Sequence, residues 1–199
     1  MKEETSVPKP PAEPGAAHRR LEVFVGTWHC EGESFAEGQA TDDPRASALP
    51  WISDETYEWL PGNFFLLHRW QAKAGSRRIE GAEVIGCDES AGGYFTRFFD
   101  NTGNHPEYRV EVEGPIWTFS EPSTRARVTV AAGGQSMRFD WEWKNDGKDW
   151  LPLCERTAVK VGSRWHAGRS PQAGRSAITP ATIAPAPTAA GEIGPRVTY

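Results

Sequence analysis

Several features that assign proteins to familiar classes are scarce or missing in this 199-residue chain. Cysteine occurs only at Cys30, Cys87 and Cys154, an odd number at wide spacing, so we expect free thiols and no disulfide framework. No apolar run approaches the ~20 residues of a membrane-spanning helix, and the first residues lack the apolar core of a secretory signal. These absences predict a cytoplasmic protein without a membrane span.

Basic residues are also in the minority. The chain has 22 Lys and Arg against 27 Asp and Glu, a formal net charge of −5, whereas nucleic-acid-binding proteins are usually basic. The metal-site spacings C-x-x-C, H-x-x-x-H and H-E-x-x-H are absent, as are the G-x-S-x-G motif and nucleotide-binding glycine loops. We therefore expect no nucleic-acid partner and no bound metal, and the motifs identify no reaction.

Apolar residues make up only 38% of the chain and are unevenly distributed. Residues 1–17 and 162–199 are rich in Pro and Ala and have few large apolar side chains, so we expect a disordered N-terminal arm and a disordered C-terminal tail. Residues 18–161 remain as a single domain that is large enough to bury a core.

Apolar and polar residues alternate with a period of two through this domain, as in RFDWEWK at 138–144 and YRVEVE at 108–113. Turn signals separate the alternating runs, and the only good helix candidate is short, at 16–25. The pattern predicts about ten strands, at 27–35, 51–60, 63–72, 77–87, 93–99, 107–113, 116–120, 125–131, 136–144 and 150–161. We expect an all-β, antiparallel, up-and-down barrel, because closure removes exposed strand edges.

Three stretches of the sequence resemble the uncharacterised DUF1579 family. They are LEVFVGTWHCEG at 21–32, EVIGCDESAGGYFTRFFDN at 83–101 and WEWKNDGKDWLPLCE at 141–155. The Gly-x-Trp at 26–28, after a short helix, is also similar to the opening of calycin barrels, which include lipocalins, fatty-acid-binding proteins and nitrobindins. The resemblance implies a calycin-like barrel, and the family has no established activity.

The Gly-x-Trp pattern also has a physical reading. Gly26 allows a sharp turn from helix to strand, and Trp28 then closes one end of the barrel with a large apolar side chain. In calycins an Arg from the last strand covers this Trp. The resemblance therefore implies that Arg156 stacks on Trp28 and that these two residues and Gly26 have a structural role.

A titratable side chain is predicted on an apolar strand face. His68 has the same parity as Phe64, Leu66 and Trp70, so it faces the interior of the predicted barrel. A barrel of ten strands is difficult to fill with side chains, so we expect a cavity that binds a hydrophobic small molecule. An alternative of equal weight is a core histidine bonded to a backbone carbonyl. The candidate ligand-binding residues are Tyr57, His68, Trp70, Arg97, Tyr108, Trp117 and Trp141.

Three other functions stay open at this point. The first is an enzyme in which His68 works with Tyr57 or Asp100 as acid and base. The second is a haem barrel similar to nitrobindins, but these use a histidine late in the chain, and the last predicted strand has none, so we expect no cofactor. The third is a homodimer without a ligand, and the sequence does not decide between monomer and homodimer.

Overall fold

The computed structural model describes residues 13–37, 42–88, 92–145 and 149–162. Most of the predicted arm and tail, residues 1–12 and 163–199, lies outside the described residues. A short helix, α1, spans Ala16–Arg20 and continues into a 3-10 turn, η1, at Leu21–Val23. The helix therefore begins two residues before residue 18, where composition predicted the start of the domain.

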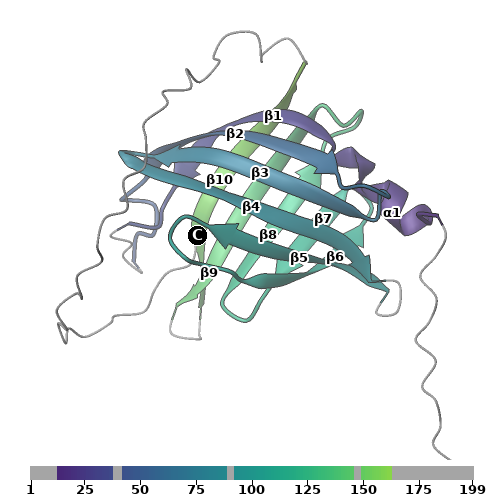
Figure 1. Ribbon diagram of the computed structural model, residues 1–199. Helices are drawn as coiled ribbons and strands as arrows, with labels where there is room; N and C mark the ends of the chain where they lie inside the picture. The colour runs from purple at the N-terminus through teal and green to yellow at the C-terminus, as the bar shows by residue number, and fades with distance from the viewer. Residues whose placement is uncertain (1–12, 38–41, 89–91, 146–148, 163–199) are drawn as a thin grey trace, which may run out of the picture.

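The rest of the described chain consists of β-strands joined by turns and loops, and all ten predicted strands are present (Figure 1). They are β1 Gly26–Ser34, β2 Leu49–Trp59, β3 Phe65–Ala74, β4 Arg77–Asp88, β5 Gly93–Asp100, β6 Glu107–Glu113, β7 Ile116–Ser120, β8 Thr124–Val130, β9 Ser136–Asn145 and β10 Asp149–Val161. Most boundaries lie within two residues of the predicted ones, because the alternation that defines a strand is a local property of the sequence.

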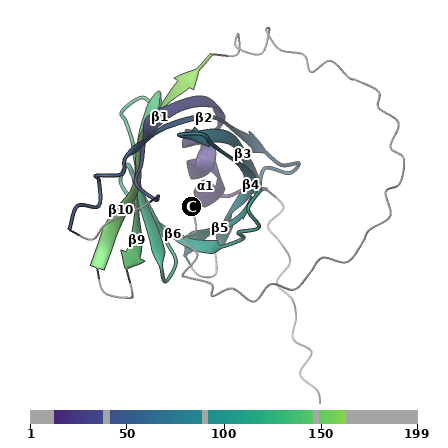
Figure 2. The ribbon, with the colours of Figure 1, turned by 90° about the vertical axis from the view of Figure 1, so that its left-hand side faces the viewer.

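The strands form one closed antiparallel barrel in which each strand pairs with its neighbours in the sequence. The first and last strands close it, with Trp28 opposite Lys160 and Gly32 opposite Arg156. The end-on view in Figure 2 shows the continuous wall. Closure leaves no unpaired strand edge along the wall, which confirms the predicted all-β barrel.

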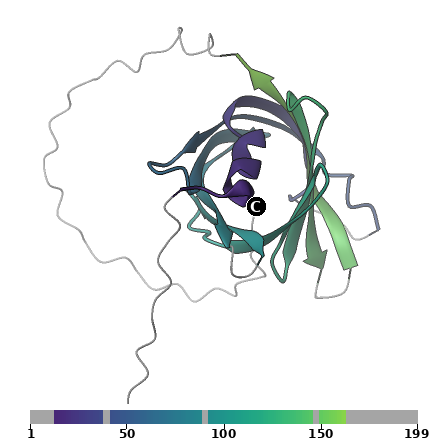
Figure 3. The ribbon, with the colours of Figure 1, turned by 90° about the vertical axis from the view of Figure 1, so that its right-hand side faces the viewer.

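The helix lies across one mouth of the barrel, as Figure 3 shows. Two hydrogen bonds fix this segment from below: Trp28 Nε1 donates to the carbonyl oxygen of Phe24 at 2.7 Å, and Tyr94 Oη donates to that of Ala17 at 2.9 Å. The chain then turns into β1 at Gly26, which has φ +134°, a conformation that favours glycine. Gly26 therefore has the turning role that we predicted.

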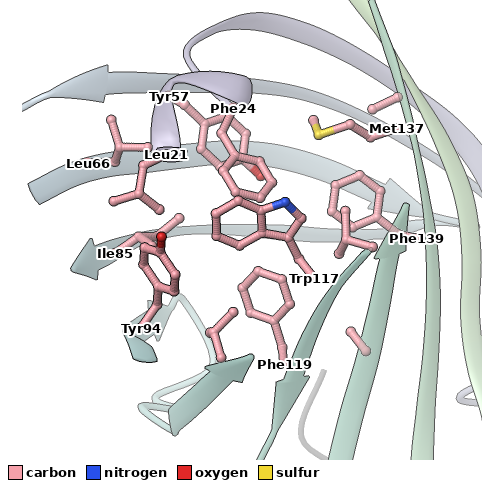
Figure 4. Packing of buried hydrophobic residues seen from close by; sticks show 14 of the residues in the cluster. Leu21, Phe24, Tyr57, Leu66, Ile85, Tyr94, Trp117, Phe119, Met137 and Phe139 are labelled. Carbon is pink, nitrogen blue, oxygen red and sulfur yellow. The ribbon is translucent and has the colours of Figure 1, made fainter. Parts of the chain in front are cut away.

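Buried side chains fill the half of the barrel beneath the helix (Figure 4). Phe24 packs on Trp117 at 4.8 Å between ring centroids and on Tyr57 at 5.7 Å. A second, smaller cluster of buried residues, including Trp51, Trp70 and Ile79, lies in another part of the lumen. A cavity lies where these two clusters meet, because its walls include members of both.

Candidate functional site

A cavity in the barrel is lined by side chains from most of the strands together with Phe24 below the helix. The volume within which the centre of a water molecule fits is about 70 Å³. On the same measure a single ordered water needs only ~10–15 Å³, so the cavity is several times larger than one water requires. Its walls are mainly aromatic and aliphatic. They comprise Phe24, Trp51, Tyr57, His68, Trp70, Ile79, Glu83, Ile85, Phe98, Phe119, Val128, Phe139, Trp141, Leu153, Cys154 and Arg156. The lumen is thus neither fully packed nor wide open.

A β-bulge in the last strand shapes one wall of the cavity. The pairing between β9 and β10 shifts between Pro152 and Cys154, so that Leu153 is inserted between the paired positions. Adjacent residues of a regular strand point to opposite faces, but here both Leu153 and Cys154 are buried and border the cavity. The bulge therefore adds an extra apolar side chain to the lumen.

A fully buried carboxylate, Glu55 on β2, organises the polar side of the cavity. Its side chain is only 1% exposed, and it does not itself border the cavity. One oxygen, Oε1, accepts a hydrogen bond from Ser53 Oγ at 2.8 Å, and Oε2 accepts one from Tyr57 Oη at 3.4 Å. Ser53 is in turn held by Trp51 Nε1 at 3.1 Å. Glu55 is thus fixed from its own strand.

His68 on β3 lies between two carboxylates. Its Nε2 is 3.2 Å from Glu55 Oε2, and its Nδ1 is 3.0 Å from Glu83 Oε2 on β4. A neutral imidazole has only one N–H, whereas the imidazolium form has two and can donate to both acceptors. The geometry therefore favours a protonated His68, bonded to two side chains and not to the backbone carbonyl of the sequence alternative.

The electrostatics agree with that assignment. Burial lowers the pKa of His68, but the hydrogen bonds and negative charges of Glu55 and Glu83 outweigh it, so the pKa is raised above 6.5. Burial raises the pKa of Glu55, but Arg156 and His68 outweigh it and hold that pKa well below its usual value. Burial also raises the pKa of Tyr57, with the charge of Glu55 adding to it, so Tyr57 stays neutral.

Arg156 on β10 is the second cation at the cavity wall. Its Nη1 lies 3.5 Å from Glu55 Oε1, and its side chain is 10% exposed. The guanidinium carbon lies 5.1 Å from the ring centroid of Trp51 and 4.7 Å from that of Phe139. These two aromatic contacts hold a charged group beside a largely apolar cavity.

The expected stacking of Arg156 on Trp28 is wrong. Lys160, four residues further along β10, covers Trp28, with its Nζ 5.2 Å from the ring centroid. The strand register explains the difference, because Trp28 pairs with Lys160 whereas Arg156 pairs with Gly32. A cation from the last strand does cover the Trp, but it is a lysine, and Arg156 belongs to the cavity.

The predicted ligand-binding residues fall into three places. Four of them border the cavity: Tyr57, His68, Trp70 and Trp141. Tyr108 and Trp117 are buried in the interior but are not among the residues that border the cavity. Arg97 lies on the outer surface, where its side chain is 64% exposed and its Nε donates to Glu107 at 2.9 Å. Its outward direction follows from its position in β5, since Thr96 beside it is buried.

The two carboxylates that contact His68, Glu55 and Glu83, were not among the predicted residues. The signal was available, because Glu55 has the same parity as Trp51 and Tyr57 on β2. Glu83 likewise has the parity of Ile79 and Ile85 on β4. Parity alone places a charge on an inward face, but it does not show that the charges of three strands meet.

Other residues considered for chemistry have local roles. Asp100 ends β5, where its Oδ1 accepts hydrogen bonds from the backbone N–H groups of Thr102 at 2.8 Å and Asn104 at 3.0 Å. It does not border the cavity, so a pairing with His68 is not supported. Within the described residues no group of three or more His, Cys, Asp or Glu is placed to hold a metal ion.

The site does not fit haem. Both ring nitrogens of His68 are bonded to carboxylates and would have to give up one partner to ligate iron. The cavity of about 70 Å³ is also small beside the ~300 Å³ at the lower end of ordinary ligand pockets. His166 lies outside the described residues.

The family comparison agrees with the sequence. Residues 13–108 match the model of a family described as "Protein of unknown function (DUF1579)". This match confirms the family resemblance over the first two stretches, at 21–32 and 83–101, whereas the third, at 141–155, lies outside the matched residues. The matched residues cover the helix, β1 to β5 and the start of β6. No curated protein matches the chain.

Solved structures share the architecture at low sequence identity. A crystal structure of Rv2717c from M. tuberculosis has a TM-score of 0.52 at 11% identity, covering 75% of this chain and 100% of that one. The S-type phycobiliprotein lyase CPES from Guillardia theta has a TM-score of 0.51 at 13% identity, covering 75% and 95%. Zebrafish ileal bile acid-binding protein with cholic acid has a TM-score of 0.42 at 14% identity, covering 70% and 99%. The first two likenesses show a common calycin-like fold. Among the described residues, no helix has the length and apolar character needed to span a bilayer.

Proposed function

We propose that this barrel, whose residues 13–108 match the DUF1579 family, binds a small, flat, largely apolar molecule in its lumen. The observation that supports this most directly is the combination of vacant space with aromatic walls and a fixed polar side. Trp51, Trp70 and Trp141 supply flat apolar surfaces, and His68, Glu83 and Arg156 supply the polar contacts. Such a mixture of an apolar lining with a few fixed polar groups is typical of ligand sites.

The polar side is preorganised. Glu55 lies behind the cavity wall and contacts both His68 and Arg156, so the two cations keep their positions without a ligand. A site whose polar groups are already fixed loses little conformational entropy on binding. The volume limits the occupant to a compact molecule, such as a single-ring aromatic compound.

Tryptophan fluorescence tests this proposal, because three indole rings border the cavity. Single-ring aromatic compounds should quench the emission of the wild-type protein to saturation. They should also raise its melting temperature, since a ligand at 100 times its Kd adds about 2.7 kcal/mol of stability. Absence of saturable quenching and of thermal stabilisation for every compound would overturn the proposal.

A matched pair of substitutions locates the binding. Ile79→Phe adds volume to a residue that is 2% exposed and borders the cavity, whereas Ile52→Phe makes the same change at a residue that is 50% exposed on the outer face. We expect Ile79→Phe to weaken binding and Ile52→Phe to leave it unchanged. Equal effects of both substitutions would mean that the ligand binds elsewhere.

Proton transfer on the bound molecule is a second candidate function. Glu83 borders the cavity, and its Oε2 is bonded to His68 Nδ1 at 3.0 Å, so a carboxylate held by an imidazole faces the lumen. Deuterium incorporation into a bound molecule, followed by NMR in D₂O, would support this function if Glu83→Gln abolished it. No incorporation by the wild-type protein would leave binding alone.

A further inference from the structure

We propose that the ligand carries a carboxylate and that Arg156 binds it; this inference rests on the proposed function and specifies the chemical class of the ligand. The ligand is then a compact aryl or similar acid. Its carboxylate contacts Arg156, and its apolar part lies against the aromatic walls.

The Arg156 guanidinium carries five N–H groups but has a single ion-pair partner among the described residues. That partner is Glu55, whose Oε1 lies 3.5 Å from Nη1. Its Nε is buried and has no hydrogen-bond partner among the described residues. Trp51 and Phe139, which pack against it, cannot accept a conventional hydrogen bond.

Glu55 has no acceptor site to spare, because its two oxygens have about four lone-pair sites and already face four donors, Arg156 Nη1 among them. Oε1 accepts from Ser53 at 2.8 Å, and Oε2 accepts from His68 at 3.2 Å and from Tyr57 at 3.4 Å. Leaving donors of a buried cation unpaired is costly, and buried polar groups in proteins usually have a partner. Arg156 borders the cavity, so an acceptor carried by a molecule in the lumen can add to the few partners of the guanidinium.

The charges that border the cavity favour an anion. Arg156 and the protonated His68 contribute two positive charges to the wall, whereas Glu83 contributes one negative charge. Glu55 balances them from behind the wall and does not itself border the cavity. An ammonium group placed among these residues would lie beside two cations.

The shape of the guanidinium favours a carboxylate over a single-point acceptor. Arg presents a planar fork of N–H donors that matches the two oxygens of a carboxylate, and such charge-assisted pairs are about twice as strong as neutral hydrogen bonds. The aromatic contacts with Trp51 and Phe139 hold the guanidinium in place. The site therefore recognises the carboxylate by geometry as well as by charge.

Three probes of nearly the same size test the inference by calorimetry on the wild-type protein. Phenylacetate carries the carboxylate, phenylacetamide is its neutral counterpart, and phenethylamine carries a positive charge. We expect phenylacetate to bind about tenfold or more tightly than phenylacetamide, and phenethylamine to bind most weakly. Equal binding of acid and amide, or tightest binding of the amine, would overturn the inference while leaving the lumen as a binding site. No binding by any of the three would contradict the proposed function itself.

Substitutions then assign the effect to Arg156. Arg156→Lys keeps the charge next to Glu55 but removes the fork, so phenylacetate should lose about tenfold in affinity and phenylacetamide should change little. Arg69→Lys is the matched control, because Arg69 is 56% exposed and pairs with Glu58 on the outer surface. Loss of affinity for acid and amide alike in Arg156→Lys would indicate a packing role and would contradict carboxylate recognition. The wild-type probe series decides the inference even if a variant does not fold.

Discussion

The rings of Tyr57 and His68 stack in parallel, with their centroids 3.8 Å apart and an interplanar angle of 5°. The two residues are direct partners across β2 and β3. Since Glu55 contacts both of them, the stack and the carboxylate form one rigid unit at the wall of the cavity. The charge of Glu55 inside the otherwise apolar barrel is thus stabilised by an ion pair and hydrogen bonds and not by solvent.

Removing the central carboxylate is expected to destabilise the protein strongly. Glu55→Gln leaves Arg156 and His68 without their shared counter-charge, and breaking a buried ion pair on one side typically costs about 3–5 kcal/mol. Chemical denaturation measures the change in the free energy of unfolding. Glu58→Gln is the control, because this carboxylate lies on the same strand, is 67% exposed and pairs with Arg69; an exposed pair contributes about 0–1 kcal/mol. Equal losses in both variants would contradict a structural role for the buried pair.

Protonation of His68 should make stability depend on pH. Its pKa in the folded state is raised above 6.5, so its contribution is fully present below about pH 6.5 and is lost as the pH rises through the folded-state pKa. Glu55 behaves oppositely, because its pKa is lowered from 4.5: its contribution is present above that pH and is lost as the pH falls through the folded-state value.

Denaturation across the pH range checks this dependence. His68→Gln should flatten the decline in stability on the alkaline side. His29→Gln is the control, because His29 also has a raised pKa, caused by its hydrogen bond to Asp54, but is 37% exposed. Solvent screens that outer pair, so we expect a smaller effect. An unchanged alkaline decline in His68→Gln would show that His68 is neutral in the folded protein.

Closure of the barrel depends on the absence of a side chain at Gly32. A Cβ atom there would overlap the carbonyl oxygen of Glu155 and would lie 2.6 Å from the Cα of Arg156, both of them backbone atoms of β10. Gly32→Ala should therefore force β1 and β10 apart and destabilise the protein by about 1–3 kcal/mol. Gly162→Ala, where a Cβ meets no atom within 4 Å, should be neutral in the same thermal melts. A neutral Gly32→Ala would mean that the strands separate at little cost.

The cation over Trp28 makes a smaller contribution. Lys160→Met retains an unbranched apolar side chain but removes the charge above the indole ring, which should cost about 0.5–1 kcal/mol. Lys73→Met, at an exposed position of β3, should have an effect within about 0.5 kcal/mol of zero. Thermal melts of both variants measure the difference. No difference between them would show that the contact between Lys160 and Trp28 is not stabilising.

The sequence was sufficient for the strands and for the inward face of His68, because both depend on alternation within a few residues. Arg97 shows that the same rule was applied incompletely, since its neighbours Tyr94 and Thr96 already mark the opposite parity as inward. Parity likewise places Glu55 on the inward face of β2 beside Trp51 and Tyr57. Alternation is therefore sufficient to place both residues.

Other features depend on long-range register, which the sequence does not contain. Whether Arg156 or Lys160 covers Trp28 is set by the pairing of the first strand with the last, more than one hundred residues apart. The inward placement of Leu153 depends on a bulge that breaks the alternation. The meeting of Glu55, His68 and Glu83 likewise requires the registers of β2, β3 and β4.

The most direct test of the account is an isotope-filtered NOE experiment on the labelled protein with phenylacetate. The account predicts contacts from the ring protons of the ligand to methyl groups of Ile79, Val128 and Leu153, which border the cavity. Contacts only to outer residues such as Ile52 and Val159, which are 50% and 52% exposed, or no contacts at saturating ligand, would contradict a binding site in the lumen.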